Sequence, residues 1–223
     1  MKRFLATAVL ALLAIGGLAA CSSGDDEAVV TVNGEVVLDE GDWRTEIDQI
    51  GDSTEYLDAF GARGTGGDST LDSGELTSIL SNHVFAPLVA QLVEDEEIEV
   101  TDEDRQTGTD ILTSVLANPP QESGNAPIAL EDMPEDYANL LKEIYANFTA
   151  ALRHYGADPA DQNDPNIQAA QEQFNAALDQ LRTDAEVEIN PRYGTWNPEQ
   201  VGVDPPEGPI TPTTLPVAVP AGG

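Results

Sequence analysis

The sequence predicts a mainly α-helical fold with a small β element, in which an N-terminal β-hairpin pairs with a late strand and several amphipathic helices form a cradle. The dipeptide Asn33-Gly34 lies between two valine-rich runs and is the one that best suits a type I′ hairpin turn. Apolar residues recur every three or four positions in several later stretches. The segment Ala185–Asn190 alternates as a strand does, and because isolated ribbons are marginal we expect it to pair beside Val29–Asn33.

The first half of the chain predicts two helices. The spacing of Trp43, Ile47 and Ile50 indicates a short helix over 39–50. Residues 61–74 form a glycine-rich break, which lacks the lysine of a phosphate-binding loop and the central glycine of an EF-hand, and we expect a flexible loop there. The clearest helix covers 76–97, where Pro87 should kink or split it.

The second half continues the helical pattern. Thr101, with Asp104 three residues later, predicts a capped helix that ends at Asn118-Pro119-Pro120. Pro134 suits the first turn of the next helix, and Asp164-Pro165 should open a last one. From Glu199 onward prolines are frequent, so we expect residues 199–223 to be a disordered tail.

The N-terminus has the pattern of an export signal. Lys2 and Arg3 precede an apolar run, Phe4–Ile15, that is too short to span a bilayer comfortably. The following Leu18–Cys21 (LAAC) resembles a bacterial lipobox, which implies cleavage before Cys21 and lipid on its sulfur and new amino group. Cys21 is the sole cysteine, so it has no disulfide partner within the chain. We therefore expect a signal peptide over 1–20 and a lipidated polar tether over 21–27; a plain secretory signal with an incidental cysteine is the alternative.

The charge balance excludes nucleic acid as a partner. The formal net charge is −32, and removal of residues 1–20, which hold two basic residues and no acidic ones, makes it −34. Such a field repels phosphate backbones. An acidic, lysine-poor surface also keeps proteins soluble, so the acidity by itself indicates no specific site.

No pattern in the sequence indicates an enzyme, a metal site or a cofactor. The two histidines, His83 and His154, lie far apart on separate predicted helices. The run Glu94–Asp104 is rich in carboxylates but lacks the glycines that fold such groups around calcium, so a solvated charged face is expected. The sequence predicts no catalytic residues.

One short stretch, Glu188–Gln200 (EINPRYGTWNPEQ), gathers an arginine and two aromatic residues near the end of the chain. No nucleophile, base or metal ligand accompanies Arg192, Tyr193 and Trp196. We interpret the stretch as a clasp, in which the aromatic rings fold over the sheet or the helix of Trp43 and Arg192 pairs with a carboxylate.

Three segments together resemble the non-catalytic chaperone module of SurA-type and PrsA-type extracytoplasmic foldases. Val30–Trp43 resembles the family's opening strand, Val-Asn-Gly turn and first helix. Leu76–Gln106 resembles its apolar helix, short connector and capped helix, with Ile98, Val100 and Thr101–Glu103 in the connector. Ala185–Glu199 resembles the closing strand of actinobacterial lipoproteins of this kind. The parvulin domain that isomerises prolyl bonds in some members has no counterpart here.

The resemblance implies a SurA N-terminal-like chaperone domain over 28–198 in a lipid-anchored protein on the outer face of the cytoplasmic membrane or in the cell envelope. The expected function is to bind unfolded exported polypeptides without isomerase activity. A scaffold that docks one cell-envelope partner, and a prolyl isomerase with an unrecognised site, are the alternatives; the sequence does not indicate the oligomeric state. The candidate client contacts are Tyr137, Tyr145, Phe148 and Tyr155, since aromatic residues dominate adaptable interfaces, although the same residues could simply pack the core.

Overall fold

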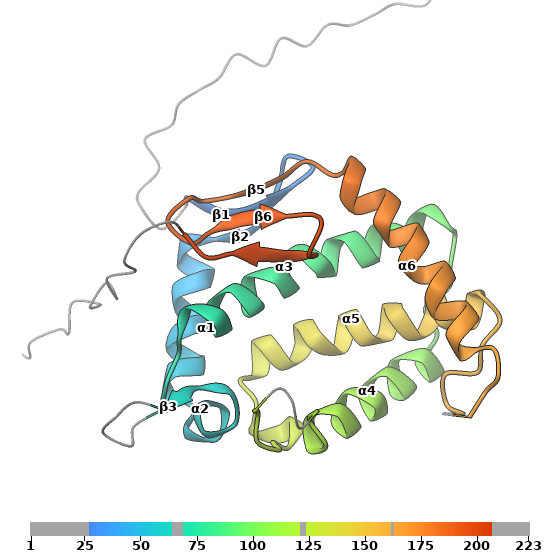
Figure 1. The fold of residues 1–223 in the computed structure, drawn as a ribbon, viewed down its shortest axis with the longest axis horizontal. Helices are drawn as coiled ribbons and strands as arrows, with labels where there is room; N and C mark the ends of the chain where they lie inside the picture. The colour runs from blue at the N-terminus through green and yellow to red at the C-terminus, as the bar shows by residue number, and fades with distance from the viewer. Residues whose placement is uncertain (1–26, 64–68, 121–123, 162, 207–223) are drawn as a thin grey trace, which may run out of the picture.

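The computed structural model of the chain describes residues 27–63, 69–120, 124–161 and 163–206 (Figure 1). Its helices are α1 (Glu40–Asp52), α2 (Thr54–Phe60), α3 (Ser73–Asp95), α4 (Asp102–Ala117), the 3₁₀ helix η2 (Leu130–Asp132), α5 (Glu135–His154) and α6 (Ile167–Asp184). Its strands are β1 (Ala28–Val32), β2 (Glu35–Asp39), β3 (Ala62–Arg63), β4 (Ser69–Thr70), β5 (Val187–Ile189), β6 (Thr195–Asn197) and β7 (Gly202–Asp204). The predicted fold class, mainly helical with a small antiparallel sheet, is confirmed.

The main sheet joins the two ends of the described fold. Its order is β2-β1-β5, with both pairs antiparallel and Val30 opposite Ile189. The hairpin turn is at Asn33-Gly34, whose φ angles of 54° and 80° are those a type I′ turn requires of both central residues. The predicted hairpin and its pairing with the late strand are therefore confirmed.

Helix α3 is the central element of the core. It lies between the sheet and α5 (Figure 1) and also contacts α6. Its inward face is fully buried, with Val84, Leu88 and Val89 at 0% exposure. The helix continues through Pro87, so it is not split there: the packing of these side chains outweighs the hydrogen bond that proline cannot donate.

Helices α4 and α5 pack closely beneath α3 (Figure 1). Thr101 and Asp104 form the predicted capping box at the start of α4. The buried Asp104 carboxylate also accepts hydrogen bonds from Arg153 Nε and Nη2 on α5, both at 2.8 Å. Gly108 permits the close approach, because a Cβ at this position would lie 2.7 Å from the backbone carbon of Tyr145.

Two helix starts differ from the sequence-based expectation. Pro134 is the N-cap of α5 and adopts an extended conformation, so the helix begins one residue later than expected. Helix α6 begins at Ile167, not at Asp164-Pro165. The reason is that Asp164 accepts hydrogen bonds from the backbone N–H groups of Asp158 and Asn166, which holds this region in turns.

Two short ribbons were not expected. Strands β3 and β4 pair across the glycine-rich break, of which residues 64–68 lie outside the described part. Strands β6 and β7 form a second ribbon, in which Trp196 lies opposite Val203. The backbone N–H of Val203 donates to Ser81 Oγ on α3 at 2.9 Å, and its side chain is buried. The prediction of disorder from Glu199 is therefore wrong for residues 199–206, and the fold extends beyond 198; residues 207–223 lie outside the described part.

Candidate functional site

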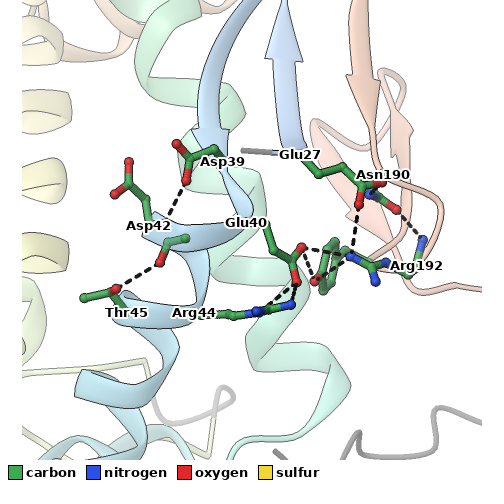
Figure 2. Close-up of polar contacts among 10 residues, drawn as sticks. Glu27, Asp39, Glu40, Asp42, Arg44, Thr45, Asn190 and Arg192 are labelled. Atoms are coloured by element: carbon green, nitrogen blue, oxygen red, sulfur yellow. Dashed lines mark hydrogen bonds and ion pairs between the residues drawn. The ribbon is translucent and has the colours of Figure 1, made fainter. Parts of the chain in front are cut away.

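The stretch around Arg192 forms the predicted clasp. The Glu40 carboxylate at the start of α1 is 3% exposed and lies between Arg44 and Arg192 (Figure 2). Arg192 Nη2 lies 3.0 Å from Glu40 Oε2, and the Tyr193 hydroxyl donates to the same oxygen at 2.6 Å. The Tyr193 ring meets the Trp43 ring edge-on at 5.8 Å. Burial, together with the hydrogen bond and the charge of Glu40, raises the pKa of Tyr193 to about 12.

The two histidines occupy separate places. His83 on α3 has its Nε2 2.7 Å from Glu46 Oε2 on α1, and both side chains are largely buried. His154 ends α5, where its Nε2 lies 3.8 Å from Glu96 Oε2. Within the described ranges, no group of three or more His, Cys, Asp or Glu residues is arranged to hold a metal ion.

A crevice of about 430 Å³, which we call the aromatic crevice, lies among the helices of the described fold. It is formed by α2, α3, α4, α5 and α6 and by parts of the connection between α4 and α5. Its lining residues are Tyr56, Phe60, Glu75, Ser78, Asn82, Phe85, Leu112, Val115, Leu116, Asn125, Met133, Tyr137, Leu141, Ile144, Tyr145, Phe148 and Phe174. The volume falls within the range of about 300–1,000 Å³ typical of ligand pockets.

Aromatic side chains are concentrated in this crevice. The chain has five Phe, five Tyr and two Trp residues, and four of the Phe and three of the Tyr line it. The crevice opens to solvent along a rim that includes Val115, which is 44% exposed, and the exposed Ser78 and Asn125. A largely apolar pocket with a few polar groups is the usual form of a binding site.

A polar cluster occupies the part of the crevice between α2, α3 and α5. The Tyr56 hydroxyl donates to Glu75 Oε1, and Asn82 Nδ2 donates to the Tyr137 hydroxyl at 2.7 Å. Burial raises the pKa of Glu75, although the hydrogen bond from Tyr56 partly offsets this effect. Burial also raises the pKa of both tyrosines. Both hydroxyls are protonated at neutral pH; that of Tyr56 donates to Glu75, and that of Tyr137 accepts from Asn82.

Three of the four candidate client contacts lie in the crevice. Tyr137, Tyr145 and Phe148 share one face of α5 and line it, and the Phe148 ring meets Phe174 of α6 edge-on at 4.9 Å. Tyr137 is buried, so it also belongs to the core, whereas Tyr145 and Phe148 are half-buried. Tyr155 is the C-cap of α5 and does not line the crevice. Tyr155 follows Tyr145 by ten residues, a rise of about 15 Å along the helix, so it lies at the far end of α5.

The structure adds residues that the sequence reasoning missed. Phe60, Phe85 and Phe174 come from α2, α3 and α6, and Tyr56 and Glu75 provide the polar cluster. The expected lipidation site, Cys21, lies outside the described residues. Of the described helices, α3 is the one long and apolar enough to cross a membrane by length and composition. Its place in the core accounts for this composition, since Ile79, Leu80, Val84 and Leu88 are each at most 1% exposed.

Comparison of the chain with models of known protein families, with curated proteins and with solved structures gives no match.

Proposed function

We propose that this protein is a membrane-anchored extracytoplasmic chaperone that holds unfolded exported polypeptides in the aromatic crevice, without isomerase activity. The observation that carries the proposal is the concentration of seven aromatic side chains in one open crevice. Four of these rings, those of Phe60, Phe85, Tyr145 and Phe148, are half-buried and not fully buried, and a largely apolar pocket with a few polar groups is the usual form of a binding site. The helices around it supply a rigid frame, because α4 and α5 are joined through Asp104 and Arg153.

The proposal is tested by an aggregation assay with a reduced, secreted client protein. The purified domain should suppress light scattering at stoichiometric concentration. Tyr145→Ala, which removes a half-buried ring from the crevice, should weaken the suppression several-fold. Tyr155→Ala is the matched control: it removes the same side chain, also half-buried, from the same helix, but outside the crevice.

Two results would overturn this proposal. One is the absence of suppression by the wild-type protein at stoichiometric concentration. The other is an equal loss of suppression in the Tyr145 and Tyr155 variants when both melt at the same temperature. Capture of a single envelope partner, with no affinity for unfolded chains, would favour a dedicated scaffold instead, and acceleration of prolyl isomerisation above buffer would favour an isomerase.

The anchor is tested separately with the full chain in a bacterial host. Two or more acyl chains give durable membrane attachment, whereas one does not. We expect Cys21→Ser to move the protein from the membrane fraction to the extracytoplasmic or secreted fraction and to abolish incorporation of labelled fatty acid. Retention of Cys21→Ser in the membrane would contradict the lipid anchor, while leaving the role of the crevice unaffected.

A further inference from the structure

Glu75 stands out among the residues of the aromatic crevice because it carries the one carboxylate of the described lining, which includes no lysine or arginine. It lies in the first turn of α3, where its backbone N–H donates to the N-cap Asp72 at 2.9 Å. Its side chain is directed to the wall formed by Tyr56 on α2, whose hydroxyl donates to Oε1. The carboxylate is therefore held in place within largely apolar surroundings.

The second carboxylate oxygen, Oε2, is left available. Within the described part of the chain it accepts no hydrogen bond, and Glu75 forms no ion pair with a lysine or arginine. A partly buried carboxylate without a cationic partner is costly, and an incoming cation offsets that cost by a charge-assisted hydrogen bond. The neighbouring Tyr56 donates a hydrogen bond to Glu75 but carries no positive charge.

The crevice around Glu75 suits the rest of a basic side chain. Lysine and arginine have apolar stems that pack on hydrophobic surface while the charged head reaches a polar partner. Phe60 and Phe85 line the same crevice as Glu75, and aromatic rings also attract cations through their faces. The net charge of −32 adds a long-range attraction for basic segments and a repulsion for acidic ones.

We propose that Glu75 makes the aromatic crevice selective for polypeptide segments in which a lysine or arginine lies next to apolar residues. This inference rests on the proposed function and specifies the class of segment that is bound. The basic head occupies the site beside Glu75 Oε2, and the neighbouring apolar side chains occupy the part lined by Tyr145, Phe148 and Phe174. The chain's own segment 207–223 contains no lysine or arginine and therefore lacks the group that this site recognises.

The test measures binding of three labelled, unstructured peptides by fluorescence anisotropy. The peptides share their length and apolar residues and differ in one central residue, which is Lys, Gln or Glu. We expect the wild-type protein to bind the Lys peptide about tenfold more tightly than the Gln peptide, and the Glu peptide to bind most weakly. Glu75→Gln should bind the Lys and Gln peptides equally.

Glu143→Gln is the matched control for the variant. It removes the same charge from an exposed position on α5. Other residues of α5 line the crevice, but Glu143 does not. It should keep the preference for the Lys peptide. Glutamine at 75 can still accept the hydrogen bond from Tyr56, so we expect the variant to fold, and equal melting temperatures would verify this.

The outcomes separate the inference from the proposed function. Equal binding of all three peptides by the wild-type protein, or an equal loss of preference in both variants, would overturn selection by Glu75 and leave a general chaperone crevice. Failure of every peptide to bind would overturn the proposed function as well. Competition by a synthetic 207–223 peptide as strong as that of the Lys peptide would show that the crevice serves the chain's own tail, which would also overturn the proposal.

Discussion

Replacing Glu40 with Gln should destabilise the fold through the clasp. Glutamine keeps the shape of the side chain and removes its charge. The buried Glu40 carboxylate accepts hydrogen bonds from Arg44 Nε at 3.0 Å, Arg192 Nη2 at 3.0 Å and the Tyr193 hydroxyl at 2.6 Å. Since Arg192 and Tyr193 follow the closing strand β5, the loss weakens the connection between the two ends of the fold (Figure 2).

The size of the effect follows from the exposure of the partners. A hydrogen bond to a charged group contributes about 1.5–3 kcal/mol when well shielded. The Arg44 and Arg192 side chains are 47% and 57% exposed, so both regain hydration and the loss per bond is closer to 1 kcal/mol. We therefore expect the free energy of unfolding to fall by about 2 kcal/mol, and the melting temperature by roughly 4–8 °C for a domain of this size.

The measurement is thermal and urea unfolding of Glu40→Gln beside Asp42→Asn. Asp42 is exposed on the same helix, so its neutralisation relieves the same overall repulsion and should change stability by less than about 0.5 kcal/mol. The double variant Glu40→Gln with Arg192→Gln should lose less than the two single variants together, by at least about 0.5 kcal/mol. Equal melts of Glu40→Gln and Asp42→Asn, or strict additivity, would refute the clasp.

Three further predictions test other contacts. Trp196→Ala removes a half-buried ring packed on the core and should cost about 2 kcal/mol in the unfolding free energy; an unchanged melt would contradict its place in the clasp. Gly108→Ala places a Cβ against the backbone of Tyr145 and should lower the free energy of unfolding by about 1–2 kcal/mol. Gly51→Ala has open space around it and should raise this free energy by about 0.5–1 kcal/mol. A change of the same sign in both variants would refute the close α4–α5 contact. Burial opposes ionisation of Asp104, but its hydrogen bonds outweigh this and lower its pKa to about 2, below the unfolded value of about 3.9. Ionised Asp104 therefore contributes about 1–2 kcal/mol of stability above pH 4, and this is lost as the pH falls from about 4 to about 2. The wild-type protein should show this loss in acid melts, and an Asp104→Asn variant with the same pH dependence would contradict it.

The features that the sequence could predict depend on local chemistry. Asn33-Gly34 requires left-handed conformations that few other dipeptides adopt, and Thr101 with Asp104 satisfies backbone groups within one turn. The short ribbons could not be predicted in this way. Strands of two or three residues have no alternation to detect, and β7 follows Pro198 and Glu199 in a proline-rich segment. Strand β7 is held in place by the hydrogen bond from Val203 N–H to Ser81 Oγ, and these two residues are 122 positions apart.

The candidate site was predictable only in part for a similar reason. Tyr137, Tyr145 and Phe148 could be selected because one helix places them on one face. Phe60, Phe85 and Phe174 reach the same crevice from three other helices, and no local pattern relates them. Tyr155 has the same helical phase as Tyr137 but is separated from it by 18 positions along α5, so periodicity alone could not show that it lies outside the crevice.

The pairing of β1 with β5 also determines when the sheet can form during synthesis. Asn33 bonds to Glu186 across 153 positions, and Glu27 to Asn190 across 163. The hairpin leaves the ribosome early, but a two-stranded ribbon alone is marginally stable, and its third strand is made after every helix. Closure of such a distant pair is slow. The main sheet therefore stays incomplete until the segment that follows α6 has been made, so the junction between the two ends of the described fold is among its last parts to form.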